Sequence, residues 1–252
     1  VSLGTKYVGR KVMLYDWVTS TNDLAHWLAR HDEHEGTVVF ARGQTQGRGR
    51  LGKDWVSPYN QGLYFSFILR PGIPAEDAAR ITLTVAWGIA RALAEVHVPE
   101  VSIKWPNDIL VRGKKVCGIL TEMHLEGATI DYVVVGAGLN VNAASAELPP
   151  GSTSLKIEAK GAFDLADLSH IILRKIDEAY TTLLKRRFDD ILTGVKKYSG
   201  LVLGGRVRVT WEGKEVEGYA VDFDEHGRLI IRRDSGLLEK IAAGHLEMIK
   251  GA

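Results

Sequence analysis

The sequence predicts an α+β fold in two parts: a mixed sheet with helices packed on one side over residues 1–203, and a small C-terminal β-barrel over residues 204–252. In the first part, apolar stretches of strand length alternate with helical ones, and a long apolar helix is expected at Glu76–Val96. Around Tyr198–Gly205 the helical periodicity stops and glycines gather. Only short alternating strands and tight turns follow, a pattern typical of a small barrel.

Composition narrows the class of protein. The 252 residues are enough to bury roughly 70–75% of the unfolded surface without disulfides or a structural metal. The formal net charge of +1 argues against bulk nucleic-acid binding, so any cationic site has to be local. Cys117 is the single cysteine; we expect it in the core and the protein in the reducing cytoplasm. No apolar run has the length of a membrane span, so no membrane partner is expected.

The first expected strand, Val12–Trp17, leads into a cluster of small polar residues. A helix is expected from Ser20-Thr21-Asn22-Asp23 to about Arg30. Ser20 and Asp23 have nearly the spacing of a capping box, which would give these side chains a purely structural role. Alternatively, hydroxyls and amides at a helix N-terminus bind a polar head group. The residues alone leave both interpretations open.

The stretch Gly47–Trp55, with the sequence GRGRLGKDW, is a candidate anion-binding loop. Glycines let a ligand approach the main chain, and successive amides can form a concavity for an anion. Arg48, Arg50 and Lys53 add positive charge. Gln44, just before the loop, has the donors and acceptors that suit an amide- or urea-like ligand. We expect a loop that is loose when empty and closes over a phosphorylated ligand; a solvated basic turn is the alternative.

A second polar cluster interrupts the stretch Val101–Val111 (VSIKWPNDILV). Pro106 breaks the strand ladder, so two strand pieces are expected to flank a bend. A bend exposes side chains that a regular strand hides, and Lys104, Asn107 and Asp108 would present a cation, an amide and a carboxylate at one place. The alternative is a polar turn with a surface ion pair.

Glycines in the middle of the chain indicate close approach of a ligand or of another backbone. Gly118 lies within the expected strand Val116–His124. Gly136 and Gly138 follow the expected strand Ile130–Val135. They indicate either a second point of close approach or a tight turn. They are not a dinucleotide fingerprint, because no third glycine opens a helix.

The remaining elements follow from apolar periodicity. Further strands are expected at Thr37–Arg42, Leu63–Leu69, Val207–Trp211, Val216–Phe223, Leu229–Arg232 and Leu237–Ile241, and helices at Leu165–Leu184 and onward to about Lys197. In Leu63–Leu69 the side chains alternate, so residues 63, 65, 67 and 69 share one face.

Five segments, in this order along the chain, resemble biotin protein ligases. They are STND at 20–23, GQTQGRGRLGKDW at 43–55, KWPNDI at 104–109, GKKVCGIL at 113–120 and GAGLNVN at 136–142; TSL at 153–155 also fits. The likeness covers nearly the whole chain. It implies a catalytic biotin- and ATP-binding domain that resembles class II aminoacyl-tRNA synthetases, followed by an SH3-like domain.

The resemblance also implies a biotin–[biotin carboxyl carrier protein] ligase activity. Biotin and ATP, with Mg²⁺ as the metal, would give biotinyl-5′-adenylate and pyrophosphate. The biotinyl group would then pass to one lysine of a biotin carboxyl carrier domain. Family members often dimerise through sheet edges, so a homodimer is a possible assembly.

Motif position implies a role for individual residues. The implied biotin pocket consists of Ser20, Thr21, Asn22, Gln44, Gly47, Arg48, Lys115, Gly118, Gly136 and Gly138. The implied ATP and adenylate contacts are Arg48, Arg50, Lys53, Trp55, Asn107, Lys115 and Asn140. The implied catalytic set is Arg48, Lys104, Asp108 and Lys115, in which cations stabilise charge at the α-phosphate and Asp108 positions the incoming amine. Asn107 would help to orient phosphate and metal, while the metal ligands themselves stay unassigned.

Two features depart from the family pattern. Leu51 stands where the family loop often carries another cation, and Lys53 where it often carries an arginine. Because fewer charges would hold the phosphate, we expect the adenylate to escape somewhat faster. No helix-turn-helix segment precedes Val12, so no DNA binding is assigned to this chain.

Three alternative functions remain open at this point. A lipoate ligase or octanoyltransferase would share the catalytic fold with a different pocket. A regulator could bind biotinyl-adenylate without transferring it. A pure interaction module would use the C-terminal barrel as a peptide binder, although its balanced charge favours an accessory role beside the active site.

Overall fold

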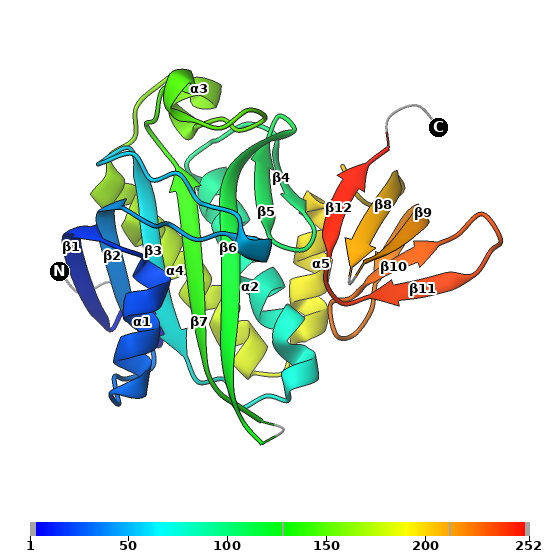
Figure 1. Cartoon of the computed structure of the whole chain (residues 1–252), viewed down its shortest axis with the longest axis horizontal. Helices are drawn as coiled ribbons and strands as arrows, with labels where there is room; N and C mark the ends of the chain where they lie inside the picture. Colours follow the sequence, from blue (N-terminus) through cyan, green and yellow to red (C-terminus); the bar gives the residue numbers. More distant parts are fainter. Residues whose placement is uncertain (1–3, 128, 212, 250–252) are drawn as a thin grey trace.

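The computed structural model describes residues 4–127, 129–211 and 213–249. A seven-stranded sheet has the strand order β1-β2-β3-β7-β6-β5-β4, and a five-stranded sheet has the order β11-β10-β9-β8-β12. Figure 1 shows the large sheet at the centre and the small C-terminal sheet to one side of it. The predicted α+β fold with a separate C-terminal β-structure is confirmed.

The elements are as follows. The first part contains β1 (Lys11–Val18), α1 (Thr21–Arg30), β2 (Thr37–Gln44), β3 (Gly62–Leu69), α2 (Ala78–Glu95), β4 (Val101–Lys104), β5 (Asp108–Val111), β6 (Lys114–Glu126), β7 (Thr129–Asn140), α3 (Leu155–Ala159), α4 (Leu165–Leu184) and α5 (Phe188–Tyr198). The second part contains β8 (Arg206–Trp211), β9 (Lys214–Phe223), β10 (Leu229–Arg232), β11 (Leu238–Ile241) and β12 (His245–Met248). Short 3-10 turns occur at Arg50–Gly52, Ala75–Asp77 and Ser145–Glu147.

The large sheet is mixed, as predicted, because β1 pairs with β2 in parallel and the other neighbours are antiparallel. The prediction that helices cover one side is wrong in one respect. Helices α2, α4 and α5 cover one face, whereas α1 lies on the opposite face (Figure 1). Ala25, Leu28 and Ala29 of α1 pack there with Ile68 and Val134, which point away from the main core.

Burial on both faces explains why β3 is apolar throughout. All eight of its residues are buried. Phe65 and Phe67 face the core beneath α2 and α4, and Ile68 faces α1. The predicted alternation is therefore correct, but neither face of this strand meets solvent.

The predicted bend at Pro106 is present in the structure, whereas the possible turn at Gly136 and Gly138 is not. The predicted bend lies between β4 and β5, which pair with each other in antiparallel register with Lys104 opposite Asp108. Gly136 and Gly138 form no turn, because both lie inside β7. Gly138 is paired with Gly118 of β6, so the two glycine segments lie side by side in the sheet.

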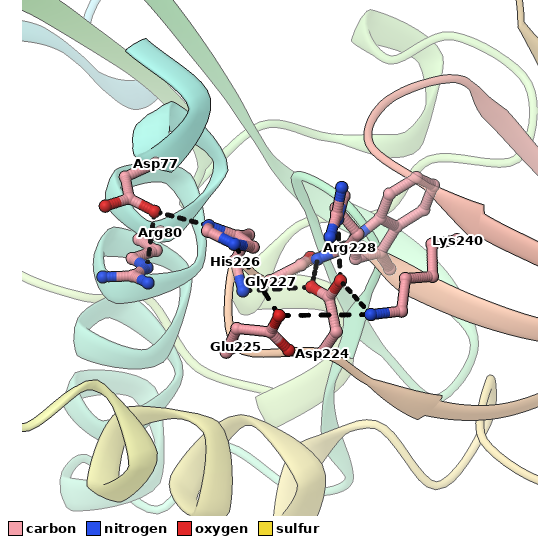
Figure 2. Close-up of polar contacts among 9 residues, drawn as sticks. Asp77, Arg80, Asp224, Glu225, His226, Gly227, Arg228 and Lys240 are labelled. Atoms are coloured by element: carbon pink, nitrogen blue, oxygen red, sulfur yellow. Dashed lines mark hydrogen bonds and ion pairs between the residues drawn. The ribbon is translucent and has the colours of Figure 1, made fainter. Parts of the chain in front are cut away.

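The C-terminal sheet is antiparallel throughout and contains one strand, β12, that the sequence analysis missed. The turn between β9 and β10 lies on the first part of the chain, where His226 meets Asp77 just before α2 (Figure 2). The predicted division at residue 203 falls in the connection between α5 and β8 and stays a prediction. Among the described residues, no helix combines the length and apolar character needed to cross a lipid bilayer.

Candidate functional site

A cavity of about 250 Å³ lies where the sheet meets the loop Gly47–Trp55. Its walls include most of the residues that the sequence singled out. These are Ser20, Thr21, Asn22, Gln44, Arg48, Arg50, Lys53, Trp55, Asn107, Asp108, Lys115, Gly118, Gly136, Gly138 and Asn140. Two candidates, Gly47 and Lys104, do not line it. Residues from five segments of the chain thus converge on one cavity.

The start of α1 forms the first wall. Ser20 is the N-cap residue, but its side chain makes no capping hydrogen bond, so the capping-box interpretation is wrong. The backbone N–H of Thr21 instead donates to Oε1 of Gln44 at 2.9 Å, and Nε2 of Gln44 donates to Oγ of Ser57 at 2.8 Å. Gln44 is therefore held in one orientation by two partners.

Asn22 is fixed by residues that the sequence analysis did not identify. The Oγ of Ser66, fully buried in β3, donates to Oδ1 of Asn22 at 2.6 Å. The Nδ2 of Asn22 donates to Oε2 of Glu122 at 2.8 Å. The side chain occupies the space over Gly136, where a Cβ atom would lie only 1.9 Å from Oδ1 of Asn22. A side chain at position 136 would displace this amide.

Arg48 is held by two carboxylates. Its Nη2 lies 2.8 Å from Oδ1 of Asp23 and 2.8 Å from Oε2 of Glu122. Glu122 also lies 3.4 Å from Nε2 of His26. Hydrogen bonds from His26 and Asn22 together with the charge of Arg48 lower the pKa of Glu122 to about 2, against the opposing effect of burial. Glu122 therefore joins the loop to α1 as a fixed negative charge.

Arg50 has a different environment. Its Nη1 donates to Oδ1 of Asn107 at 2.6 Å, and its Nη2 donates to the carbonyl of Gly244 at 3.3 Å. Burial lowers the pKa of Arg50, while the charge of Asp108 opposes this change. Within the described residues no carboxylate oxygen lies within 4.0 Å of this guanidinium. Arg50 is thus a half-buried cation whose direct partners are neutral.

Trp55 lies against the two paired glycines. Added Cβ atoms at Gly118 and Gly138 would lie 2.9 Å and 2.3 Å from its indole ring. The indole Nε1 is buried and has no hydrogen-bond partner among the described residues. An unmet buried donor costs about 1–3 kcal/mol, so a ligand acceptor or a movement of the ring would stabilise this site. The Nζ of Lys115 lies 5.5 Å from the centre of the Trp55 ring.

Lys115 and Asp108 form the polar centre of the cavity. The Nζ of Lys115 lies 2.6 Å from Oδ1 of Asp108. Asn107 donates through Nδ2 to the carbonyl of Ile119 at 2.9 Å, which leaves its Oδ1 for Arg50. Asn140 donates through Nδ2 to the carbonyl of Thr153 at 3.1 Å. Both amide side chains are thus fixed in the cavity wall by bonds to backbone carbonyls.

The remaining candidate residues lie on the loop or in the core. Lys53 is exposed on the loop. Gly47 accepts through its carbonyl from the backbone N–H of Trp55 at 2.8 Å and so closes the loop on itself. Cys117 is buried in the core as expected, and burial raises the pKa of its thiol to about 12. Among the described residues, no group of three or more His, Cys, Asp or Glu side chains has the arrangement of a metal site.

Two protein-family models match this sequence, and together they include most of the residues around the cavity. Residues 14–140 match the model of the biotin/lipoate A/B protein ligase family, which is half of the chain. The chain belongs to this family. Residues 202–247 match the model of the biotin protein ligase C-terminal domain, so the chain carries both parts of a biotin protein ligase.

The ligase is similar to curated proteins over most of its length. It is 34% identical to the bifunctional ligase/repressor BirA of Bacillus subtilis over 250 residues, which cover 98% of this chain and 76% of that protein. It is 33% identical to the biotin–[acetyl-CoA-carboxylase] ligase of Mycobacterium tuberculosis, with 84% of this chain and 79% of that protein covered.

Among solved structures, the ligase resembles the biotin protein ligase of Aquifex aeolicus in complex with biotin and ATP. The two chains are 29% identical and superpose with a TM-score of 0.81, covering 96% of this chain and 100% of the other. The family and the two-part fold inferred from the motifs are thereby confirmed, and a lipoate ligase is not favoured.

Proposed function

We propose that this ligase activates biotin with ATP as biotinyl-5′-adenylate and then transfers the biotinyl group to one lysine of a biotin carboxyl carrier domain. The proposal rests on family membership and on relatives named biotin–[acetyl-CoA-carboxylase] ligases in Mycobacterium tuberculosis and Paracoccus denitrificans. The Aquifex aeolicus relative in complex with biotin and ATP supports both small-molecule substrates.

The single observation that carries the proposal is the state of Arg50. A half-buried guanidinium that bonds only to neutral acceptors favours the binding of an anion beside it. Arg50 lies on the cavity wall with Lys53 and Lys115, and two of these three cations are free of carboxylates within 4.0 Å among the described residues. A cavity of this kind suits a phosphate group that is exchanged during the reaction.

The first half-reaction joins two anions. An oxygen of the biotin carboxylate attacks the α-phosphorus of ATP, a new P–O bond forms, and the bond to pyrophosphate breaks. Negative charge gathers on the oxygens of the α-phosphate in the transition state. Preorganised cations lower this barrier because they need no rearrangement as the charge develops. We assign this role to Lys115 and Arg50, with Arg48 near the carboxylate.

The second half-reaction requires an uncharged amine. The Nζ of the acceptor lysine attacks the acyl carbon, a C–N bond forms, and the C–O bond to AMP breaks. The amine nitrogen releases a proton to solvent as the amide forms, and Asp108 is the carboxylate that we assign to position the amine and accept hydrogen bonds from it. Release of AMP ends the contacts of Arg50 and Lys115 with the phosphate.

The residues present fit a magnesium ion delivered with ATP. Magnesium bound with nucleotides uses one or two carboxylates and keeps water and phosphate oxygens as further ligands, so a cluster of three acidic side chains is not required. Asp108 and Asp54 are the carboxylates of the cavity, and Asn107 supplies an amide oxygen. When bound, the ion would neutralise phosphate charge and help pyrophosphate to leave.

The biotin end of the cavity is assigned to Ser20, Thr21, Asn22 and Gln44. The ureido group has an oxygen acceptor and two N–H donors, and these residues offer hydroxyls and amides of both kinds. The bond from Thr21 to Gln44, and those that join Gln44 to Ser57 and Asn22 to Ser66, fix the geometry before binding. In the same proposal the carrier domain is the protein partner, the compartment is the cytoplasm, and a homodimer through a sheet edge is a possible assembly.

The decisive experiment is pyrophosphate release from purified protein and ATP. We expect release that requires biotin and is not supported by lipoate or octanoate. Addition of a biotin carboxyl carrier domain should then give a product heavier by one biotinyl group. Tight binding of biotinyl-adenylate without turnover would favour a regulator instead, and absence of both would overturn the proposal.

A further inference from the structure

The turn between β9 and β10 fastens the C-terminal sheet to the first part of the chain. The Nδ1 of His226 lies 2.7 Å from Oδ1 of Asp77, and Nε of Arg80 lies 3.0 Å from the same oxygen (Figure 2). The indole Nε1 of Trp105, which is 1% exposed, donates to the carbonyl of Gly227 at 3.2 Å. Two successive residues of the turn are therefore bound to two different segments of the first part.

The turn is itself held in one conformation by Asp224. The Oδ1 of this buried carboxylate accepts from the backbone N–H groups of His226 and Arg228, each at 3.0 Å. Its Oδ2 lies 2.7 Å from Nε of Arg228 and 3.4 Å from Nζ of Lys240 (Figure 2). The turn joins β9 to β10 directly, and the contact of Asp224 with Lys240 links it to β11.

The other end of the same sheet reaches the candidate site. Gly244, just before β12, and His245, the first residue of β12, line the cavity. The carbonyl of Gly244 accepts the hydrogen bond from Arg50, whose other nitrogen donates to Asn107. Asn107 is two residues after Trp105, so a single bend contacts both the docked turn and Arg50.

We propose that the C-terminal sheet positions the loop Gly47–Trp55: the carbonyl of Gly244 holds Arg50 closed over the cavity, and the pairs His226–Asp77 and Trp105–Gly227 set the place of that carbonyl. Arg50 has two direct acceptors among the described residues, and loss of one of them favours exposure of its guanidinium to water. His226 and Asp77 are then positioning residues that touch no substrate. The functional consequence rests on the proposed biotinyl-adenylate chemistry, whereas the mechanical link does not.

The test compares His226→Ala and Asp77→Asn with the wild-type chain. Hydrogen exchange of the amides in residues 47–55 is measured without ligand, and the dissociation rate of preformed biotinyl-adenylate is measured in parallel. We expect exchange and dissociation to be about three- to tenfold faster in both variants, the effect of one lost hydrogen bond. Biotin affinity without ATP should change little, because Thr21 donates to Gln44 and Gln44 donates to Ser57, and none of these bonds involves the C-terminal sheet. His170→Ala, on an exposed histidine of α4, is the matched control.

A double variant distinguishes an effect of His226 through Arg50 from a general loss of stability. If His226 acts through Arg50, then His226→Ala should add nothing to the faster dissociation of Arg50→Ala. Additive effects, or wild-type exchange in the loop of His226→Ala, would overturn the proposal. His226→Gln, which keeps a hydrogen-bond donor, should recover part of the protection and guards against a variant that fails to fold. If the wild-type chain formed no adenylate, the proposed function would fail, while loop exchange would still report on the link.

Discussion

The Nζ of Lys115 and Oδ1 of Asp108 lie 2.6 Å apart on neighbouring strands at the polar centre of the cavity. Asp108 opens β5 directly after the bend, and Lys115 lies near the start of β6. In the reaction that we propose, Lys115 would act on the phosphate and Asp108 on the acceptor amine, so the pair would link the two half-reactions. Substitution of one residue at a time can test the role of each.

Replacement of Lys115 by Met should abolish the first half-reaction. The substitution keeps the length of the side chain and removes the charge, so biotin-dependent pyrophosphate release should fall by about 10²–10³-fold, as for loss of one preorganised donor. Lys114→Met is the control, because Lys114 is the adjacent lysine with a side chain 59% exposed. Near wild-type release by Lys115→Met would contradict the assigned role.

Replacement of Asp108 by Asn should slow transfer to the carrier more than it slows adenylate formation. The amide of Asn keeps the shape of the side chain but cannot stabilise the positive charge that develops on the attacking amine. Lys115 remains available to the phosphate. Single-turnover measurement of both half-reactions gives the comparison. Equal slowing of the two steps would reject a separate role for Asp108 in positioning the amine.

Replacement of Gly138 by Ala should weaken ligand binding while the fold persists. The new methyl group would lie 2.3 Å from Nε1 of Trp55, so the indole has to leave the sheet. Overpacking of this kind costs about 1–3 kcal/mol, which corresponds to roughly a five- to 150-fold loss in affinity if the loop absorbs it. Titration calorimetry with biotin and with its adenylate measures the loss. Gly161→Ala, where no atom lies within 4 Å, is the control and should bind normally.

Protonation of Glu122 should destabilise the ligase in acid. Its pKa in the folded chain is about 2, below the ordinary 4.5, so its contribution is complete above about pH 4.5 and is lost between pH 4.5 and 2. The lowered pKa corresponds to a contribution of about 3 kcal/mol to the free energy of unfolding. Because the side chain is partly exposed to water, we expect roughly 1–2 kcal/mol of this contribution. Urea unfolding near pH 6 and near pH 3 measures it.

Glu122→Gln provides the comparison for that experiment. The variant should be less stable than wild type near pH 6, and the difference should shrink near pH 3 because protonation of Glu122 in the unfolded wild-type chain then favours unfolding. A difference that stays constant between the two pH values would show that the charge of Glu122 does not contribute in this way.

Replacement of Leu51 by Arg should slow the escape of the adenylate. Leu51 is 73% exposed at the tip of the loop, so a new cation can reach the phosphate without disturbing the core. A charge-assisted hydrogen bond predicts a decrease of about three- to tenfold in dissociation rate. Leu51→Gln has similar length without charge and should leave the rate unchanged. An equal effect of both variants would exclude the charge as the cause.

Most elements and most of the cavity could be predicted from the sequence because their signals are local. The bend at Pro106, the long helix α4 and the glycine–arginine loop are encoded in contiguous residues. The errors arose where burial depends on distant partners. Gly136 and Gly138 have a turn-like composition, yet they lie within β7 because Asn22 and Trp55 need the space above them.

The amino-acid sequence by itself determined most of the strands and helices, the change to short strands after residue 203 and most of the polar residues that line the cavity. Only the tertiary structure decided that Glu122 and Ser66 fix the start of α1 and that Gly244 holds Arg50. The reason is separation along the chain: Asn22 and Glu122 are 100 residues apart, and Arg50 and Gly244 are 194 residues apart. No local pattern records such a contact, because it exists only after packing has brought the two segments to the same place.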